Sequence, residues 1–272
     1  MSPVSAVLHP TFWRTFWVNA VFSPKTTLGF TRIDFVLGTI FILPLTQMLF
    51  FAFVVTLAGS GADSVAFVVV GNAVATVTYA SIFSVCQTTD HEKEGGTIEH
   101  LIVSPANRLA LYFGRGTVPI LISLASVTVG LTYAVLLFHA PLAAGAIPSL
   151  AVSVVLTCFA MVGFGLLLGG VALFLRTSIV LANIFLFIGL LISGTNFPVS
   201  ELPPWLQVAS AAFPLTWAIA SVREAMAGAP IGTLAPLWGA VLLGAVVSLA
   251  LAIALWGTFE RRALSTGSIV RF

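Results

Sequence analysis

Long apolar runs, each free of charged residues, dominate the pattern of this 272-residue chain. The runs without Asp, Glu, Lys or Arg are 35–62, 64–89, 116–175, 177–200 and 225–259. An α-helix needs about 20 apolar residues to cross the hydrocarbon core of a membrane. The longest run is interrupted by a turn-rich stretch from His139 to Pro148, so it holds two spans. The sequence therefore predicts an all-α membrane protein with six transmembrane helices.

These spans divide the chain into a cytoplasmic N-terminus (1–34), a transmembrane domain (35–259) and a cytoplasmic tail (260–272). Pro44 in the first span predicts a kink that neighbouring helices must accommodate. Gly165 and Gly169 have the spacing of small residues that allows close helix packing, as do Ala240 and Gly244. The expected spans are 35–57, 65–85, 109–138, 149–175, 178–194 and 234–259.

The composition supports a membrane protein. Only 7% of the residues are charged, against about a quarter in a soluble domain, and the mean hydropathy is +1.11. Cys86 and Cys158 both lie in or beside apolar runs, which favours buried thiols over a disulfide or a metal site. We expect no bound metal, no removable signal peptide and no nucleic-acid partner.

The basic residues indicate the orientation. With both termini inside, ten of the eleven Lys and Arg residues face the cytoplasm and only Arg223 lies outside. Cytoplasmic loops of membrane proteins carry an excess of Lys and Arg, and this excess sets the orientation. We therefore expect a multi-pass protein of the bacterial inner (plasma) membrane with both termini in the cytoplasm.

An amphipathic helix is predicted before the first span. Leu8, Phe12, Trp13, Phe16 and Trp17 recur at helical spacing, while polar residues occupy the other face. A helix packed on protein would show the same pattern. Paired Trp and Phe side chains favour the alternative of an interfacial helix that lies among the lipid headgroups.

The segment 197–228, between the fifth and sixth spans, is too apolar for a watery loop. A seventh span would place the C-terminal arginines outside and would put Pro203, Pro204 and Pro214 in one helix. Two short half-helices that enter the outer leaflet and return fit better. Such a hairpin must pack against the spans, because irregular backbone at membrane depth is tolerated only where protein or a cavity covers it.

The loop 88–105, between the second and third spans, concentrates charge. Five of the twenty charged residues lie within 90–99, and Gly95 and Gly96 predict the end of the preceding helix. Thr97 can cap a new short helix whose Ile98, Leu101 and Ile102 form an apolar strip. The strip suits a groove on a partner protein; an ordinary solvated loop is the alternative.

Two segments give the sequence a resemblance to a known family. One is Glu94-Gly-Gly-Thr-Ile-Glu-His-Leu-Ile-Val-Ser-Pro105, although Glu94 stands one residue closer to the Gly-Thr pair than in the family pattern. The other comprises Ser193-Gly-Thr-Asn-Phe-Pro198, Leu202-Pro-Pro-Trp-Leu206, Phe213-Pro-Leu-Thr216 and Arg223. With the six-span layout, these segments make the chain similar to the type-2 ABC exporter permeases, which include daunorubicin-resistance-like, nodulation-like and polysaccharide-export permeases.

The resemblance implies roles for both segments. The first would dock a separate ATPase, with Glu92, Glu94, Gly96, Thr97, Glu99, Leu101 and Pro105 as coupling residues. The second would form an extracellular re-entrant hairpin, with Phe197, Pro198, Trp205, Phe213, Pro214, Arg223 and Glu224 as candidate exit-gate residues. For Arg223 and Glu224, a structural ion pair is the alternative.

The chain itself has no site for ATP. A P-loop needs Gly-Lys-Ser/Thr, and the only lysines, Lys25 and Lys93, follow Pro24 and Glu92. We expect no catalytic residue and no cofactor here, with ATP and Mg bound by the partner. The expected partners are two ATPase subunits, a second copy of this chain or a similar permease, and membrane lipid.

Polar residues within the spans are candidates for lining a transport pathway: Gln47, Asn72, Thr76, Asn183, Ser193 and Asn196. Hydrogen bonds between helices are the alternative, usually contributing under about 1 kcal/mol each in membranes. Because no charged residue lies in the middle of a span, the expected cargo is amphiphilic or apolar and is exported with ATP. The alternatives are an ATP-independent secondary transporter and a membrane anchor or sensor that transports nothing.

Cysteine labelling tests the orientation. In a background with Cys86→Ala and Cys158→Ala, we expect Ser200→Cys to react with an impermeant maleimide in intact cells. Ser268→Cys should react only after permeabilisation, because the basic residues place the C-terminus inside. Labelling of Ser268→Cys in intact cells would contradict the six-span topology.

Overall fold

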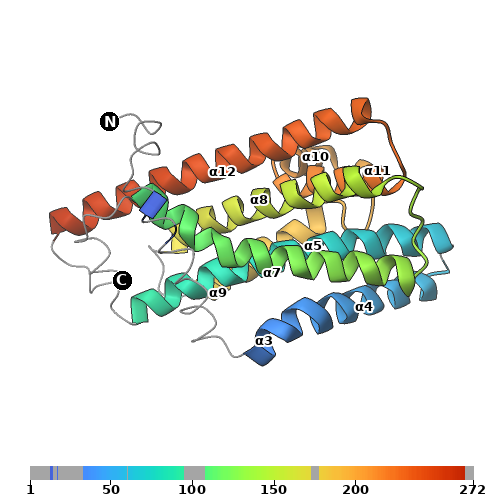
Figure 1. Ribbon diagram of the computed structural model, residues 1–272, viewed down its shortest axis with the longest axis horizontal. Coiled ribbons are helices and arrows are strands. Elements are labelled where there is room, and N and C mark those ends of the chain that lie inside the picture. The colour runs from blue at the N-terminus through green and yellow to red at the C-terminus, as the bar shows by residue number, and fades with distance from the viewer. Residues whose placement is uncertain are drawn as a thin grey trace.

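The computed structural model describes residues 13, 14, 17, 33–59, 61–94, 108–172 and 178–266, and within these ranges the chain is a bundle of helices without strands (Figure 1). The elements in chain order are α3 (Ile33–Leu37), the π-helix η1 (Gly38–Ile42), α4 (Leu43–Leu57), α5 (Ala62–Glu94), α7 (Arg108–Leu136), α8 (Ile147–Ala172), α9 (Ser178–Ile192), the short 3-10 helix η2 (Val199–Glu201), α10 (Pro204–Ala211), α11 (Pro214–Met226) and α12 (Ile231–Thr266).

Five of these helices are long and apolar enough to cross a membrane: Gly38–Leu57, α5, α7, α8 and α12. The pair α10 and α11 has the composition of a sixth, but it bends by 84° at its break. The all-helical membrane fold with five to six apolar spans is thus confirmed. The side on which the hairpin lies and the six-span count remain predictions.

The expected fifth span is shorter than a membrane. The helix α9 has 15 residues, which at 1.5 Å per residue extend about 22 Å, whereas a hydrocarbon core is about 30 Å thick. It ends at Ile192 because Gly194 turns the chain with a positive φ of 76°. The segment that follows α9 is no longer helical, and its Ser193 and Thr195 are buried in the bundle.

The first span contains an irregular turn just before Pro44. Gly38–Ile42 is π-helical, and the N–H of Leu43 donates to the carbonyl oxygen of Gly38, five residues earlier. A proline inside a helix has no N–H and its ring crowds the preceding turn, so a wider turn there relieves both problems. The irregularity predicted from Pro44 lies one turn before it.

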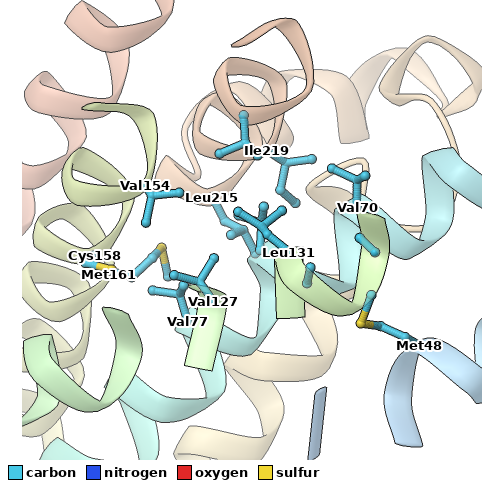
Figure 2. Packing of buried hydrophobic residues seen from close by; sticks show 14 of the residues in the cluster. Met48, Val70, Val77, Val127, Leu131, Val154, Cys158, Met161, Leu215 and Ile219 are labelled. Carbon is cyan, nitrogen blue, oxygen red and sulfur yellow. The ribbon is translucent and has the colours of Figure 1, made fainter. Parts of the chain in front are cut away.

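The helix α5 forms the centre of the bundle. It contacts α4, α7, α8, α9 and α11, and α12 packs on α8 at one side (Figure 1). Figure 2 shows part of the core around it, where side chains of α4, α5, α7, α8 and α11 meet. The labelled members are Met48, Val70, Val77, Val127, Leu131, Val154, Cys158, Met161, Leu215 and Ile219.

Small residues let neighbouring helices approach α5 closely. A Cβ added at Gly165 of α8 would lie 3.0 Å from the carbonyl oxygen of Ser81, and one at Gly169 would lie 2.7 Å from Cγ1 of Val85. The close packing expected for this glycine pair is confirmed. Gly244, of the pair Ala240 and Gly244, instead faces Pro214 of α11. This glycine therefore makes room for the hairpin and not for another long span.

The amphipathic N-terminal helix falls almost wholly outside the described residues. Of the predicted stretch, only Trp13, Arg14 and Trp17 are described, and both indole side chains are exposed. The interfacial helix remains a prediction.

Candidate functional site

The segment Ser193–Pro198 joins α9 to the hairpin, and the candidate site is built around it. Beyond Ile192 the backbone is no longer helical, so the carbonyl oxygens of this segment lack the regular hydrogen-bond partners of a helix. Ser193 and Thr195 are buried, and a buried carbonyl without a partner costs about 2 kcal/mol or more. Partners for these oxygens must therefore come from other parts of the chain.

Arg223 of α11 supplies them. Its Nη1 donates to the carbonyl oxygen of Gly194 at 2.8 Å, and its Nη2 donates to those of Thr195 at 3.0 Å and Phe67 at 2.8 Å. The guanidinium carbon lies 3.4 Å from the centre of the Phe67 ring, a cation–π contact. A cation at the C-terminal end of α9 also complements the helix dipole. Arg223 thus joins α5, α11 and the end of α9.

The alternative pairing of Arg223 with Glu224 does not occur in the structure. Glu224 is exposed, whereas the Arg223 guanidinium points to backbone oxygens. Within the described residues its Nε is buried and makes no hydrogen bond.

Gly71 makes room for this cluster. A Cβ at position 71 would overlap the carbonyl oxygen of Thr195 and lie 2.5 Å from Nη2 of Arg223. Only glycine lets α5 pass so close to the irregular segment. The need for a glycine here was not recognised in the sequence, although a single glycine inside an apolar helix can signal close backbone approach.

Three of the predicted pathway residues form one hydrogen-bond network. The side-chain Nε2 of Gln47 in α4 donates to Oδ1 of Asn72 at 3.1 Å. The Nδ2 of Asn72 donates to Oδ1 of Asn196 at 2.8 Å and to the carbonyl oxygen of Val68 at 2.9 Å. Asn72 is fully buried, so this network ties α4 and the segment after α9 to α5.

The other three predicted pathway residues lie apart from that network. Ser193 is buried and shares a hydrogen bond with the Thr195 hydroxyl at 2.8 Å. The Thr76 hydroxyl donates to Ala73 and the Asn183 amide to Ile179, each within its own helix. A role of these six residues in lining a pathway remains a prediction.

The turn between α10 and α11 packs into the bundle. Phe213 is buried, and its ring stands edge-on to that of Phe164 of α8, with 5.0 Å between the ring centres. A Cβ at Gly189 of α9 would lie 2.8 Å from the Phe213 ring, and one at Gly244 of α12 would lie 2.9 Å from Pro214. Phe213 and Pro214 therefore lie in a slot formed by α8, α9 and α12.

The remaining candidate gate residues lie outside this slot. Phe197 is half-buried, whereas Pro198 is exposed. Trp205 on α10 is 71% exposed. The exit-gate candidates thus separate into a packed group, Phe213, Pro214 and Arg223, and an outer group.

The predicted docking loop lies mostly beyond the described residues. Glu92 and Glu94 belong to the last turn of α5, and their side chains are not described. Gly96, Thr97, Glu99, Leu101 and Pro105 lie outside the described ranges. The coupling role of these residues remains a prediction.

One contact near this loop was missed in the sequence. Oδ2 of Asp90, near the end of α5, accepts hydrogen bonds from the backbone N–H of Ser178 at 3.1 Å and from its hydroxyl at 2.6 Å. Asp90 had been counted only as one of the loop charges. A serine directly before an apolar run is a helix-start signal, but nothing in the sequence indicates that a carboxylate 88 residues earlier would meet it.

Two comparisons with known proteins agree on the family that this chain resembles. A family model described as "ABC-2 type transporter" matches residues 20–227. Over 116 residues the chain is 27% identical to "Probable multidrug ABC transporter permease YbhR" of Escherichia coli K12, and equally to the protein of that name in Escherichia coli O157:H7. The match covers 43% of this chain and 31% of each relative.

We expect Gly71→Ala to destabilise the protein, because the added methyl must displace Thr195 or Arg223. Overpacking of this kind costs about 1–3 kcal/mol. Thermal unfolding of the purified protein in detergent would measure the loss. Gly239→Ala is the matched control, since a Cβ there meets nothing within 4 Å, and it should unfold at or above the wild-type temperature. If Gly71→Ala were as stable as that control, the close approach would be wrong.

Proposed function

This chain belongs to the ABC-2 type transporter family, and on that premise we propose that it is the transmembrane permease subunit of an ATP-driven exporter. The match to the family over residues 20–227 is the observation that supports this function most directly. The subunit moves an amphiphilic or apolar molecule out of the cell. The energy comes from ATP hydrolysed by a separate polypeptide, because the sequence of this chain has no P-loop lysine.

The assembly in this proposal contains two ATPase subunits and two permeases, either two copies of this chain or this chain and a similar one. The loop 88–105 docks the ATPase on the cytoplasmic side. ATP and Mg bind to the ATPase subunits. When those subunits close on ATP, they draw the docking loops together and rock the spans apart at the opposite end.

The hairpin end of the bundle is where the exit would open. Phe213 and Pro214 fill the slot between α8, α9 and α12, and Arg223 holds the end of α9. Widening this end requires the hairpin to leave the slot. In this proposal the packed group acts as the exit gate.

The cargo class follows from the distribution of charge. No Asp, Glu, Lys or Arg lies in the middle of the five long spans, and ion-coupled carriers normally need ionisable groups there. The relatives in Escherichia coli are named as probable multidrug permeases, which agrees with an apolar or amphiphilic cargo. Drugs, lipids, lipid-linked molecules and hydrophobic peptides all belong to this class.

Membrane lipid is the other expected partner at the hairpin end. The helix α10 lies at 84° to α11, and its Trp205 and Val208 side chains are more than 70% exposed. Tryptophan is enriched at the headgroup level of membranes. An α10 that lies in the membrane plane would place Trp205 in the outer headgroup region beside the exit.

Reconstituted transport tests the function. Proteoliposomes would contain the chain with its co-purifying ATPase and be assayed with a fluorescent short-chain phospholipid and a lipophilic dye. We expect transport that requires ATP and that persists after the proton and sodium gradients are collapsed. Glu99→Lys, which reverses a charge in the predicted docking loop, should weaken complex formation and reduce ATP-dependent transport.

The two alternatives give different results. Transport by the chain alone, driven by an imposed ion gradient, would show a secondary transporter and overturn the proposal. Binding of the ATPase without transport of any cargo class would favour an anchor or sensor subunit. Wild-type behaviour of Glu99→Lys in assembly, ATP hydrolysis and transport would mean that this residue is merely solvated.

A further inference from the structure

We propose that Asp90 is a positioning residue that transmits movement of the ATPase-docking loop to α9 and, through α9, to the hairpin. This inference rests on the proposed function, since it concerns how ATP hydrolysis elsewhere opens the exit. It assigns a specific contact, between Asp90 and Ser178, to the coupling of the two ends of the bundle.

The contact fixes the beginning of α9 to the end of α5. Ser178 is fully buried, and besides its two hydrogen bonds to Asp90 its hydroxyl lies 3.0 Å from the carbonyl oxygen of Cys86. A carboxylate that accepts a hydrogen bond from the first N–H of a helix also faces the positive end of the helix dipole. Asp90 thus caps α9 from a different helix, four residues before the described end of α5 at Glu94.

The other end of α9 is also fixed to α5. The guanidinium of Arg223 donates both to Gly194 and Thr195, just beyond α9, and to Phe67 of α5. Gly71 of α5 lies against the same segment. Both contacts lie on α5, one continuous helix of 33 residues, about 50 Å at 1.5 Å per residue. Because α5 holds α9 at both ends, a displacement of α5 must displace α9.

Between these ends, α9 presents an apolar stripe to the bundle. Its buried residues are Ser178, Ala182, Leu186, Gly189 and Ile192, at spacings of three and four. Apolar packing is non-directional, so such a stripe resists separation from α5 more than sliding along it. A directional, charge-assisted hydrogen bond at the Asp90 end fixes the register instead.

The displacement then reaches the hairpin by direct contact. Gly189 of α9 lies against the Phe213 ring, which occupies the slot at the start of α11. A shift of α9 therefore acts on the residue that must leave the slot when the exit opens. The path runs from the docking loop through α5 and Asp90 to α9, and from Gly189 to Phe213.

Only one of the two carboxylate oxygens of Asp90 has a hydrogen-bond partner among the described residues. Its Oδ1 is buried and has no hydrogen-bond partner within the described residues. A buried acceptor without a partner destabilises the state in which it occurs. Within the described residues, the contact between α5 and α9 at this end therefore depends on the two hydrogen bonds to Oδ2.

The test measures cargo transported per ATP hydrolysed by the complete complex in proteoliposomes, with the fluorescent phospholipid and the lipophilic dye as probes. For Asp90→Ala we expect this ratio to fall about tenfold, which corresponds to about 1.4 kcal/mol and is the size of one charge-assisted hydrogen bond. Assembly and ATP hydrolysis should remain. In Asp90→Asn, which keeps an acceptor oxygen, the ratio should fall less. Thr128→Val is the control, because the exposed Thr128 hydroxyl donates within α7, to Leu124, away from the proposed path, and the ratio in this variant should stay at the wild-type value.

A second readout follows the hairpin itself. In the background without native cysteines, the labelling rate of Ser200→Cys should change between the nucleotide-free and the vanadate-trapped complex. Asp90→Ala should abolish this change. A purely structural role would lower stability, transport and hydrolysis together and leave the transport-to-ATP ratio unchanged, which would overturn the inference.

The outcomes separate this inference from the proposed function. A wild-type complex that shows no ATP-dependent transport in any assay contradicts the proposed function. A wild-type complex that transports, together with an unchanged ratio in Asp90→Ala, contradicts the inference alone. If Asp90→Ala fails to fold, the ratio in Asp90→Asn decides, and a wild-type ratio there would also overturn it.

Discussion

The hydrogen bonds from the Arg223 guanidinium to the carbonyl oxygens of Gly194 and Thr195 allow α9 to end inside the bundle. The segment after this 15-residue helix is buried in the bundle, where its carbonyl oxygens need partners from the chain. Several other features follow from this requirement. Gly71 must lack a side chain so that α5 can approach, and α11 must pack on α5 so that its arginine can reach the segment.

The same arrangement connects structure to function in the proposed exporter. The hairpin closes one end of the bundle by inserting Phe213 and Pro214 between α8, α9 and α12, while α5 extends from this end to the predicted docking loop. A single long helix that contacts most of its neighbours can pass a movement along the bundle without a chain of small rearrangements. Polar contacts at the two ends of α9 then determine which helix moves with α5.

The sequence predicted those parts of the fold that depend only on which residue types follow one another along the chain. Charge-free runs located the long helices, because any helix in hydrocarbon must be apolar. The prolines of 203–214 indicated a break in the chain, and the structure has a bend of 84° between α10 and α11. The length of α9 could not be predicted from the charge-free run, because the run continues past Ile192 whereas the backbone turns at Gly194. The contacts of Arg223 were also beyond prediction, because backbone carbonyls have no signature in the sequence. Gln47, Asn72 and Asn196 were singled out as polar residues, but only the structure shows that they bond to one another.

Hydrogen–deuterium exchange tests most directly whether Arg223 holds the end of α9. In Arg223→Gln, which keeps much of the side-chain volume but loses the forked guanidinium, amide exchange in 190–199 should rise by about tenfold or more, as expected for the loss of charge-assisted hydrogen bonds. Exchange in α7 should stay unchanged, and Glu224→Gln, at the exposed neighbouring position, should match the wild type throughout. Wild-type exchange of 190–199 in Arg223→Gln would contradict the account.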